Sequence, residues 1–316
     1  MSRDLRYGET TALLLSVVAS ALLFYSGLFA FLFAVPVQVM FTRRGERQGE
    51  LTAAVTGAAI VAIHLLQVLR IDGVRGEFLR LLFLDSLMPV GLLAGLVVFN
   101  AARRFPWWGR LMIGAAIAVL ATVPSLRILS QAGSGEGALA EQMDTMMEML
   151  GVTENSQALL RMVRQVALNT IGVGLTAAIA ANWWLGRSLV LRRYGLAQSL
   201  RSARVDPSLV WLVIVGLALV VGTWITEAPR LAPAGWNILL VGSFLYGVQG
   251  IGLMQHLLRR RGLPERGERW VLTVAMLLMF VPGINLLVVV GVPLVGMSEV
   301  WVDYKRGEEY EGHSEY

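Results

Sequence analysis

The sequence predicts an all-α protein, a polytopic transmembrane helical bundle. Of its 316 residues, 56% are hydrophobic and only 16% are charged, and the mean hydropathy is +0.63. A soluble domain carries about 25% charged residues. Apolar runs that approach the roughly 20 residues needed to cross a bilayer recur along the chain. We therefore expect a multi-pass membrane protein.

The apolar runs predict about eight spans followed by an interrupted C-terminal stretch. The predicted spans cover residues 10–25, 28–41, 51–69, 81–100, 107–129, 165–186, 207–225 and 234–258. The second of these is short and contains Pro36. The last stretch, 270–300, is too long for one straight span, and Pro282-Gly283 and Pro293 interrupt it. It is either one kinked helix or a hairpin of two short helices. We expect one transmembrane domain over residues 1–306 and a polar tail over 307–316.

The distribution of arginine predicts that the N-terminus is cytoplasmic. With that orientation, the N-terminal segment and the loops at 43–47, 103–110, 187–204 and 259–269 hold eighteen arginines on the inner side. The outer side holds seven, so the bias follows the positive-inside rule. The C-terminal tail is inside if the last stretch is a hairpin and outside if it spans once. The apolar run that follows the first nine residues has no convincing cleavage site, and we expect it to remain as a membrane helix.

One long outer loop, residues 131–160, is acidic and contains no basic residue before Arg161. Its segment GALAEQMDTMMEML places Met143, Met146, Met147 and Leu150 on one helical face. This pattern predicts an amphipathic helix that lies on the outer leaflet or caps the bundle, or else a lid over an outward-facing pocket.

Several classes of function are excluded or disfavoured. The sequence has no cysteine, which excludes disulfides and thiolate chemistry. No nucleotide-binding, zinc-protease or nucleophile-elbow motif occurs, so we expect no enzyme, no cofactor and no metal. The net charge of +5 lies in loops between apolar runs. Its predicted partners are therefore membrane lipids, and no nucleic acid is expected.

A small set of polar residues at membrane depth forms the predicted ligand site. Charged side chains are costly in the bilayer and face the protein interior or a cavity. With the predicted orientation, these residues gather in the outer half, which would suit a pocket open to the outside. The site residues are Asp85, Arg127, Gln249, Tyr246, His64 and Asn237. Asp85 and Arg127 are the charged pair of greatest interest, although each residue could instead serve only to join helices.

Small residues recur every fourth position in the first predicted span, at Ala12, Ser16 and Ser20. Such a strip allows another helix to approach closely. The partner is either a helix of the same bundle or a separate subunit. Gly242, Tyr246, Gly250 and Met254 form a similar strip in the eighth predicted span.

Three stretches together resemble a known family: VPVQVMFTRRGERQGELTA, FLYGVQGIGLMQHLLRRRG, and the broken apolar pair that ends in GMSEVWVDYKR. They resemble the YybS-like, DUF2232-type family of bacterial membrane proteins, which implies the bacterial cell (inner) membrane. That family in turn resembles in fold the S components of energy-coupling-factor vitamin transporters. S components usually have about six helices in fewer than 220 residues, so this chain would carry additional spans.

The resemblance to S components implies a bundle that binds a small hydrophilic molecule near its outer face. It also implies partners, a transmembrane coupling protein and ATPase subunits, with Ala12, Ser16 and Ser20 matching the docking strip. We therefore expect a small-solute-binding transport subunit without its own ATPase. Two alternatives remain open: a structural or assembly scaffold of the cell envelope, and a secondary carrier that uses Asp85 as its coupling group.

Overall fold

The computed structural model describes residues 3–69, 75–132, 156–194, 200, 203–278, 281–302 and 304, and all regular structure in these residues is helical. The predicted all-α membrane bundle is thus confirmed. Six of the described helices are long and apolar enough to cross a membrane, and two shorter apolar helices, Asp85–Ala101 and Ile284–Ser298, accompany them. The predicted number of about eight spans therefore differs slightly from the observed one.

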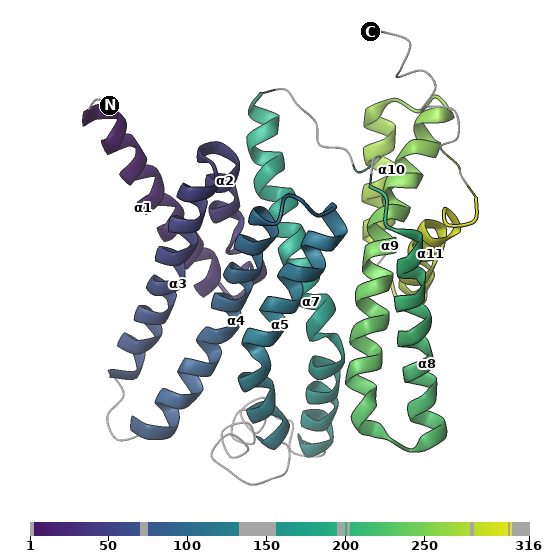
Figure 1. The fold of residues 1–316 in the computed structure, drawn as a ribbon, viewed down its shortest axis with the longest axis horizontal. Coiled ribbons are helices and arrows are strands. Elements are labelled where there is room, and N and C mark those ends of the chain that lie inside the picture. Colours follow the sequence, from purple (N-terminus) through teal and green to yellow (C-terminus); the bar gives the residue numbers. More distant parts are fainter. Residues whose placement is uncertain are drawn as a thin grey trace. The chain divides into compact units, whose positions relative to one another are not determined.

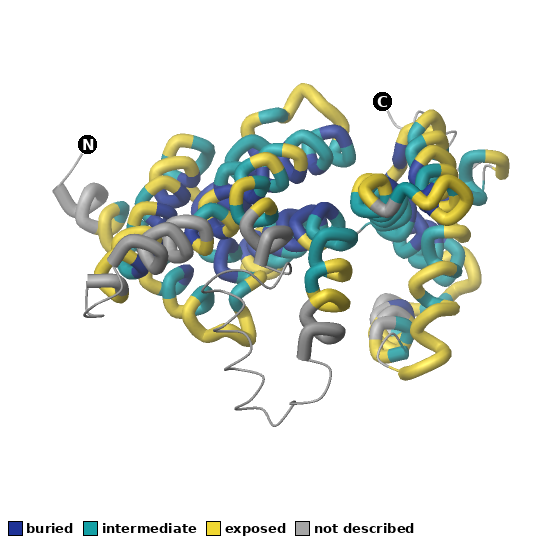
Figure 2. The backbone as a smooth tube through the Cα atoms, turned by 90° about the horizontal axis from the view of Figure 1, so that it is seen from below, coloured by how far each residue is buried: buried dark blue, intermediate teal, exposed yellow. Residues whose placement is uncertain are grey.

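The chain contacts gather into two compact units, Met1–Ala197 and Gln198–Tyr316, which we call unit 1 and unit 2. The sequence predicts a single domain over residues 1–306. The division between the two units, at residues 197 and 198, lies in an arginine-rich segment that resembles the other loops, so the sequence does not mark it. Each unit has its own buried interior, and the exposed parts of the chain lie around it (Figure 2).

Unit 1 is a bundle of helices that run back and forth between two ends (Figure 1). Its elements are α1 (Arg3–Tyr25), η1 (Ala30–Leu32), α2 (Val35–Arg44), α3 (Glu46–Leu69), α4 (Arg75–Ala101), α5 (Trp107–Ala132) and α7 (Ser156–Arg193). The turns that follow α2 and α4 and the end of α7 carry arginines and lie at one end, which we call the arginine-rich end.

The second predicted span is the main difference between sequence and structure in unit 1. Residues 28–41 form η1 and then α2, which has only 10 residues. A helix of that length extends about 15 Å, half of the hydrocarbon thickness, and cannot span it. Pro36 lies in the first turn of α2, where its missing N–H costs nothing. Gly45, with φ of +87°, then turns the chain into α3.

Glycines set the closest helix contact in unit 1. Gly95 of α4 and Gly114 of α5 face each other so closely that a methyl group on either would collide with the backbone of the other. A methyl group on Gly91, one turn away, would collide with Ala121. Close approach of this kind is how helices associate in a membrane.

Helix α7 is longer than its predicted span of 165–186. It has 38 residues, because the helix extends beyond the apolar run at both ends, and the added turns contain arginines on each side. The predicted span ends before Arg187 because a charged residue interrupts the apolar run. The backbone hydrogen bonds of a helix do not depend on hydropathy, so the helix itself continues.

In its described residues unit 2 is helical, and its two longest helices run antiparallel (Figure 1). Its elements are η2 (Pro207–Leu209), α8 (Val210–Thr226), η3 (Pro229–Leu231), α9 (Ala232–Arg260), α10 (Glu265–Leu278) and α11 (Ile284–Ser298). The interrupted C-terminal stretch is therefore two separate short helices. Gly283, with φ of +86°, precedes α11, whereas Pro293 lies inside α11 and does not end it.

The glycine strip predicted in the eighth span is a packing surface on both sides of α9. Gly242 lies against Val213 of α8, and Gly250 lies against Val292 and Gly296 of α11. The strip thus joins helices within unit 2. The methionine-rich segment of the 131–160 loop and the tail at 307–316 lie outside the described residues.

Large apolar side chains cover the outer surfaces of the helices. On α1 they include Leu14, Leu15 and Leu22, which are 55%, 66% and 68% exposed. On α8 they include Trp224 and Ile225. Surfaces of this kind are unfavourable in water but are the surfaces that helices present to lipid.

Candidate functional site

The six residues predicted to bind a ligand divide equally between the two units. His64, Asp85 and Arg127 belong to unit 1, whereas Asn237, Tyr246 and Gln249 belong to unit 2.

His64 is the centre of a polar cluster in unit 1, at the end opposite the arginine-rich end. Its Nδ1 lies 2.7 Å from the Ser86 hydroxyl, and its Nε2 lies 3.6 Å from a carboxylate oxygen of Asp85. The imidazole therefore bridges α3 and α4. Its side chain is only 6% exposed, whereas that of Asp85 is 68% exposed. The structure thus brings together two predicted site residues, and it adds Ser86, which the sequence analysis had missed.

Aromatic rings enclose the imidazole on the side of α1. The rings of Phe24 and Tyr25 meet that of His64 edge-on, with centroid separations of 5.8 and 5.6 Å. The Tyr25 hydroxyl donates to the carbonyl oxygen of Ile60 at 3.3 Å. Three helices consequently hold His64 in a fixed position, and Asp85 is the exposed member of the cluster.

Pro89 adds a second acceptor beside the Asp85 carboxylate. It lies inside α4 four residues after Asp85. A proline has no N–H, so the Asp85 carbonyl oxygen loses the α-helical hydrogen bond it would otherwise accept. This end of α4 therefore presents both a carboxylate and a backbone carbonyl that can accept hydrogen bonds.

Arg127, the predicted partner of Asp85, is exposed on α5. Helices α4 and α5 are antiparallel, with Gly95 against Gly114, so both charged residues lie toward the same end of the pair. The side chain that the structure places beside the Asp85 carboxylate is His64, at 3.6 Å.

Gln249 in unit 2 uses both ends of its amide for backbone contacts. Its Oε1 accepts from the Val205 N–H at 2.6 Å, and its Nε2 donates to the Gly296 carbonyl oxygen at 3.0 Å. The side chain is 2% exposed. It thereby joins the segment before α8, the middle of α9 and the end of α11, and its predicted contact with a ligand stays a prediction.

Tyr246 and Asn237 also contact the backbone. The Tyr246 hydroxyl donates to the Asp206 carbonyl oxygen at 3.4 Å, and the Asn237 amide donates to the Pro233 carbonyl oxygen at 2.7 Å within its own helix. Asp206 caps η2, and hydrogen bonds from the Ser208 side chain and backbone lower the pKa of the Asp206 carboxyl. The segment that enters α8 is therefore tied to α9 by Tyr246.

A buried carboxylate in unit 2 was missed by the sequence analysis. The Glu299 side chain is 3% exposed and lies 3.7 Å from the Arg204 guanidinium. Glu299 follows directly on α11. A carboxylate that directly follows an apolar run lies close to membrane depth, and this is the signal that could have identified Glu299.

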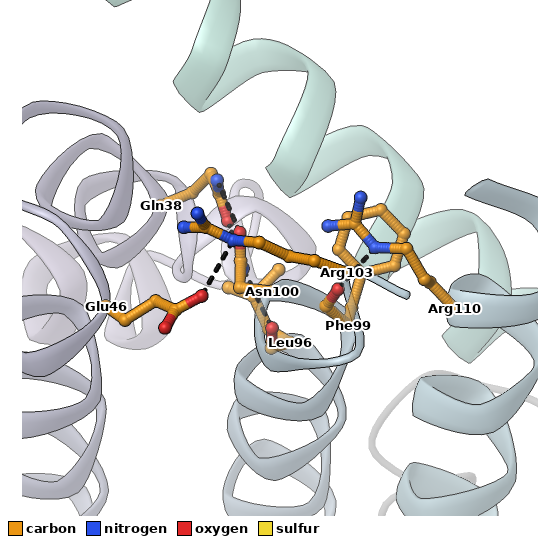
Figure 3. A network of polar contacts seen from close by, with 7 residues as sticks. All are labelled: Gln38, Glu46, Leu96, Phe99, Asn100, Arg103 and Arg110. Atoms are coloured by element: carbon orange, nitrogen blue, oxygen red, sulfur yellow. Dashed lines mark hydrogen bonds and ion pairs between the residues drawn. The ribbon is translucent and has the colours of Figure 1, made fainter. Parts of the chain in front are cut away.

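A second missed pair joins the half-length helix α2 to α4. Gln38 and Asn100 exchange hydrogen bonds at 3.2 and 2.8 Å, and Asn100 also donates to the Leu96 carbonyl oxygen (Figure 3). The two residues are 62 positions apart in the sequence, so their contact could not be predicted from a local sequence pattern. This amide pair holds α2 in place.

The strip formed by Ala12, Ser16 and Ser20 is buried in unit 1 only at its Ser20 end. Ser20 is completely buried, and Ala12 and Ser16 are partly buried. Large apolar side chains cover the outer face of α1 instead. Of the two partners that the sequence left open, a helix of the same bundle accounts for Ser20, and docking of another subunit at Ala12 and Ser16 stays a prediction.

The long apolar helices, with their lipid-facing outer surfaces and polar clusters inside, define a polytopic membrane protein. Residues 10–293 match the model of a family described as predicted membrane protein DUF2232. The chain belongs to this family, as the YybS-like stretches of its sequence predict. No curated protein and no solved structure matches the chain. The more distant likeness to S components stays a prediction.

Proposed function

We propose that the protein is a small-solute-binding transport subunit without its own ATPase, and that unit 1 is the part that binds the solute. One observation carries the proposal: in its described residues, unit 1 has six α-helices within residues 1–197, of which α2 is too short to span the membrane. S components usually have about six helices in fewer than 220 residues. The additional spans implied by the resemblance then correspond to unit 2.

The His64 cluster is the proposed contact for the solute. It lies at the end of unit 1 where the resemblance implies a binding site, and the exposed Asp85 carboxylate is paired with a buried imidazole. Together with the Asp85 carbonyl oxygen, to which Pro89 has no N–H to donate, this carboxylate can accept hydrogen bonds. A small hydrophilic solute that donates hydrogen bonds is therefore its proposed ligand.

Binding is a better account of this cluster than catalysis. A hydroxyl, an imidazole and a carboxylate are the groups of a nucleophilic triad. Ser86, however, is 3% exposed, so its hydroxyl has no access to a substrate. The buried Ser86 and His64 instead orient the one exposed member, Asp85.

The test of the proposed partners is purification of the tagged full-length chain from its membranes in mild detergent. We expect a transmembrane coupling protein and two ATPase subunits to accompany it, and the purified assembly to hydrolyse ATP. Co-purification of envelope assembly proteins without any ATPase would contradict the proposal and favour the scaffold.

A proton-coupled secondary carrier is the second candidate, and the position of the Asp85 carboxylate beside the buried His64 imidazole favours it. Carboxylate and histidine pairs within membranes often relay protons. In reconstituted vesicles that contain this chain alone, solute uptake driven by a proton gradient without ATP would favour the carrier over the transport subunit.

A further inference from the structure

Three arginines gather at the arginine-rich end of unit 1, away from the proposed solute site. Arg103 lies in the turn after α4, Arg110 lies in the first turn of α5, and Arg187 lies near the end of α7. Arg110 and Arg187 are linked by the touching rings of Phe99 and Trp183. The Arg103 guanidinium points to Glu46 (Figure 3). We call these three residues the guanidinium cluster.

Aromatic rings and one carbonyl hold two of the guanidinium groups in place. Arg110 donates from Nε to the Phe99 carbonyl oxygen at 2.8 Å and lies over the Phe99 ring at 4.4 Å (Figure 3). The Phe99 ring meets that of Trp183 edge-on at 5.4 Å, and Arg187 lies 5.7 Å from the Trp183 ring. These contacts already order the Arg110 and Arg187 side chains, so little side-chain entropy would be lost when a ligand binds to them.

The cluster carries more positive charge than its surroundings neutralise. Glu46 forms an ion pair with Arg103 at 2.7 Å. The segments 43–50, 103–110 and 187–193 contain nine arginines and two glutamates. Positive charges that lie close together repel one another. An anion bound between the guanidinium groups would offset that repulsion.

The geometry of the donors favours a phosphoryl group over a single carboxylate. The terminal nitrogens of Arg110 make no hydrogen bond to any described residue, and the Arg187 guanidinium is exposed. Planar guanidinium groups from different helices can each donate two parallel hydrogen bonds, and a phosphoryl group offers enough oxygens to accept from several of them. We propose that the guanidinium cluster binds a phosphoryl group, carried either by an anionic lipid headgroup or by a soluble phosphate compound.

The experiment uses the full-length protein, delipidated in neutral detergent. Phosphatidylglycerol is titrated and bound lipid is counted by native mass spectrometry, and inorganic phosphate is titrated separately with thermal stability as the readout. The variants are Arg187→Gln, which is exposed, and Arg110→Gln. Arg104→Gln is the matched control, because Arg104 lies in the same turn as Arg103 but stacks on Phe105.

We expect saturable binding by the wild type, weakened about tenfold or more by Arg187→Gln and by Arg110→Gln, and unchanged by Arg104→Gln. Binding of phosphatidylglycerol alone identifies a lipid headgroup as the source, and binding of inorganic phosphate as well identifies a soluble phosphate compound. Wild-type affinity in Arg187→Gln, or an equal loss in Arg104→Gln, would overturn the proposal. Because Arg187 is exposed, its variant remains informative even if Arg110→Gln fails to fold.

Discussion

Asp85 and Gln249 are both polar residues within apolar helices, yet their surroundings differ. Asp85 is the exposed end of a chain of contacts that begins at buried Ser86 and passes through His64. Gln249 is buried, and each end of its amide is hydrogen-bonded to the backbone of another segment. The first arrangement leaves a charge available to a solute, whereas the second stabilises the fold.

Replacing Gln249 with leucine should destabilise unit 2. The change leaves the Val205 N–H buried without its partner, and an unsatisfied buried group costs about 1–3 kcal/mol. It also removes one of the hydrogen bonds that the Gly296 carbonyl oxygen accepts, although the Glu299 N–H still donates to that oxygen. Thermal unfolding in mild detergent should report a lower Tm for Gln249→Leu than for Asn237→Ala, because the amide of the exchanged Asn237 donates to a carbonyl oxygen within its own helix. Equal Tm values for the two variants would show that Gln249 does not hold these segments together.

At the scale of helices, glycine positions determine which helices pack closely. Gly296 of α11 lies against the backbone of Tyr246 and Gly250 in α9, whereas Gly291 of the same helix faces open space. The contact between the two helices depends on the absence of a side chain at Gly296.

Gly296→Ala should therefore destabilise the protein, by about 1–3 kcal/mol as expected for overpacking. Gly291→Ala should be neutral or stabilising by up to about 1 kcal/mol, because alanine is the better helix former. Thermal unfolding of the two variants measures the difference. A Gly296→Ala protein as stable as Gly291→Ala would contradict the close contact between α9 and α11.

The apolar pattern predicted most helices correctly, because the bilayer requires long apolar segments whose backbone groups are all paired. It overestimated residues 28–41, since hydropathy cannot distinguish a half-length helix held by the Gln38–Asn100 pair from a short span. It shortened α7, since arginines beyond the apolar run still continue the helix. The ion partner of Asp85 could not be predicted, because it depends on how α3 packs on α4.

At the scale of the whole molecule, the arginines predict which end of unit 1 faces the cytoplasm. The sequence contains no cysteine, so single cysteines can report accessibility without any background. Gln67 and Arg104 are exposed and lie near opposite ends of unit 1.

In intact cells, a membrane-impermeant maleimide should label Gln67→Cys and should not label Arg104→Cys until the cells are permeabilised. The reverse pattern would invert the predicted orientation and place the His64 cluster on the cytoplasmic side.

The division into two units gives the proposed function its structural basis, because unit 1 has the size and, with the half-length α2 counted, the helix number that the predicted likeness to S components implies. The most direct test is native mass spectrometry of the gently purified full-length protein, compared with its Asp85→Asn and Asp206→Asn variants. We expect a defined small molecule on the wild type and on Asp206→Asn, and its loss from Asp85→Asn. A wild-type protein without any bound solute, or a solute retained equally by Asp85→Asn, would contradict solute binding at the His64 cluster.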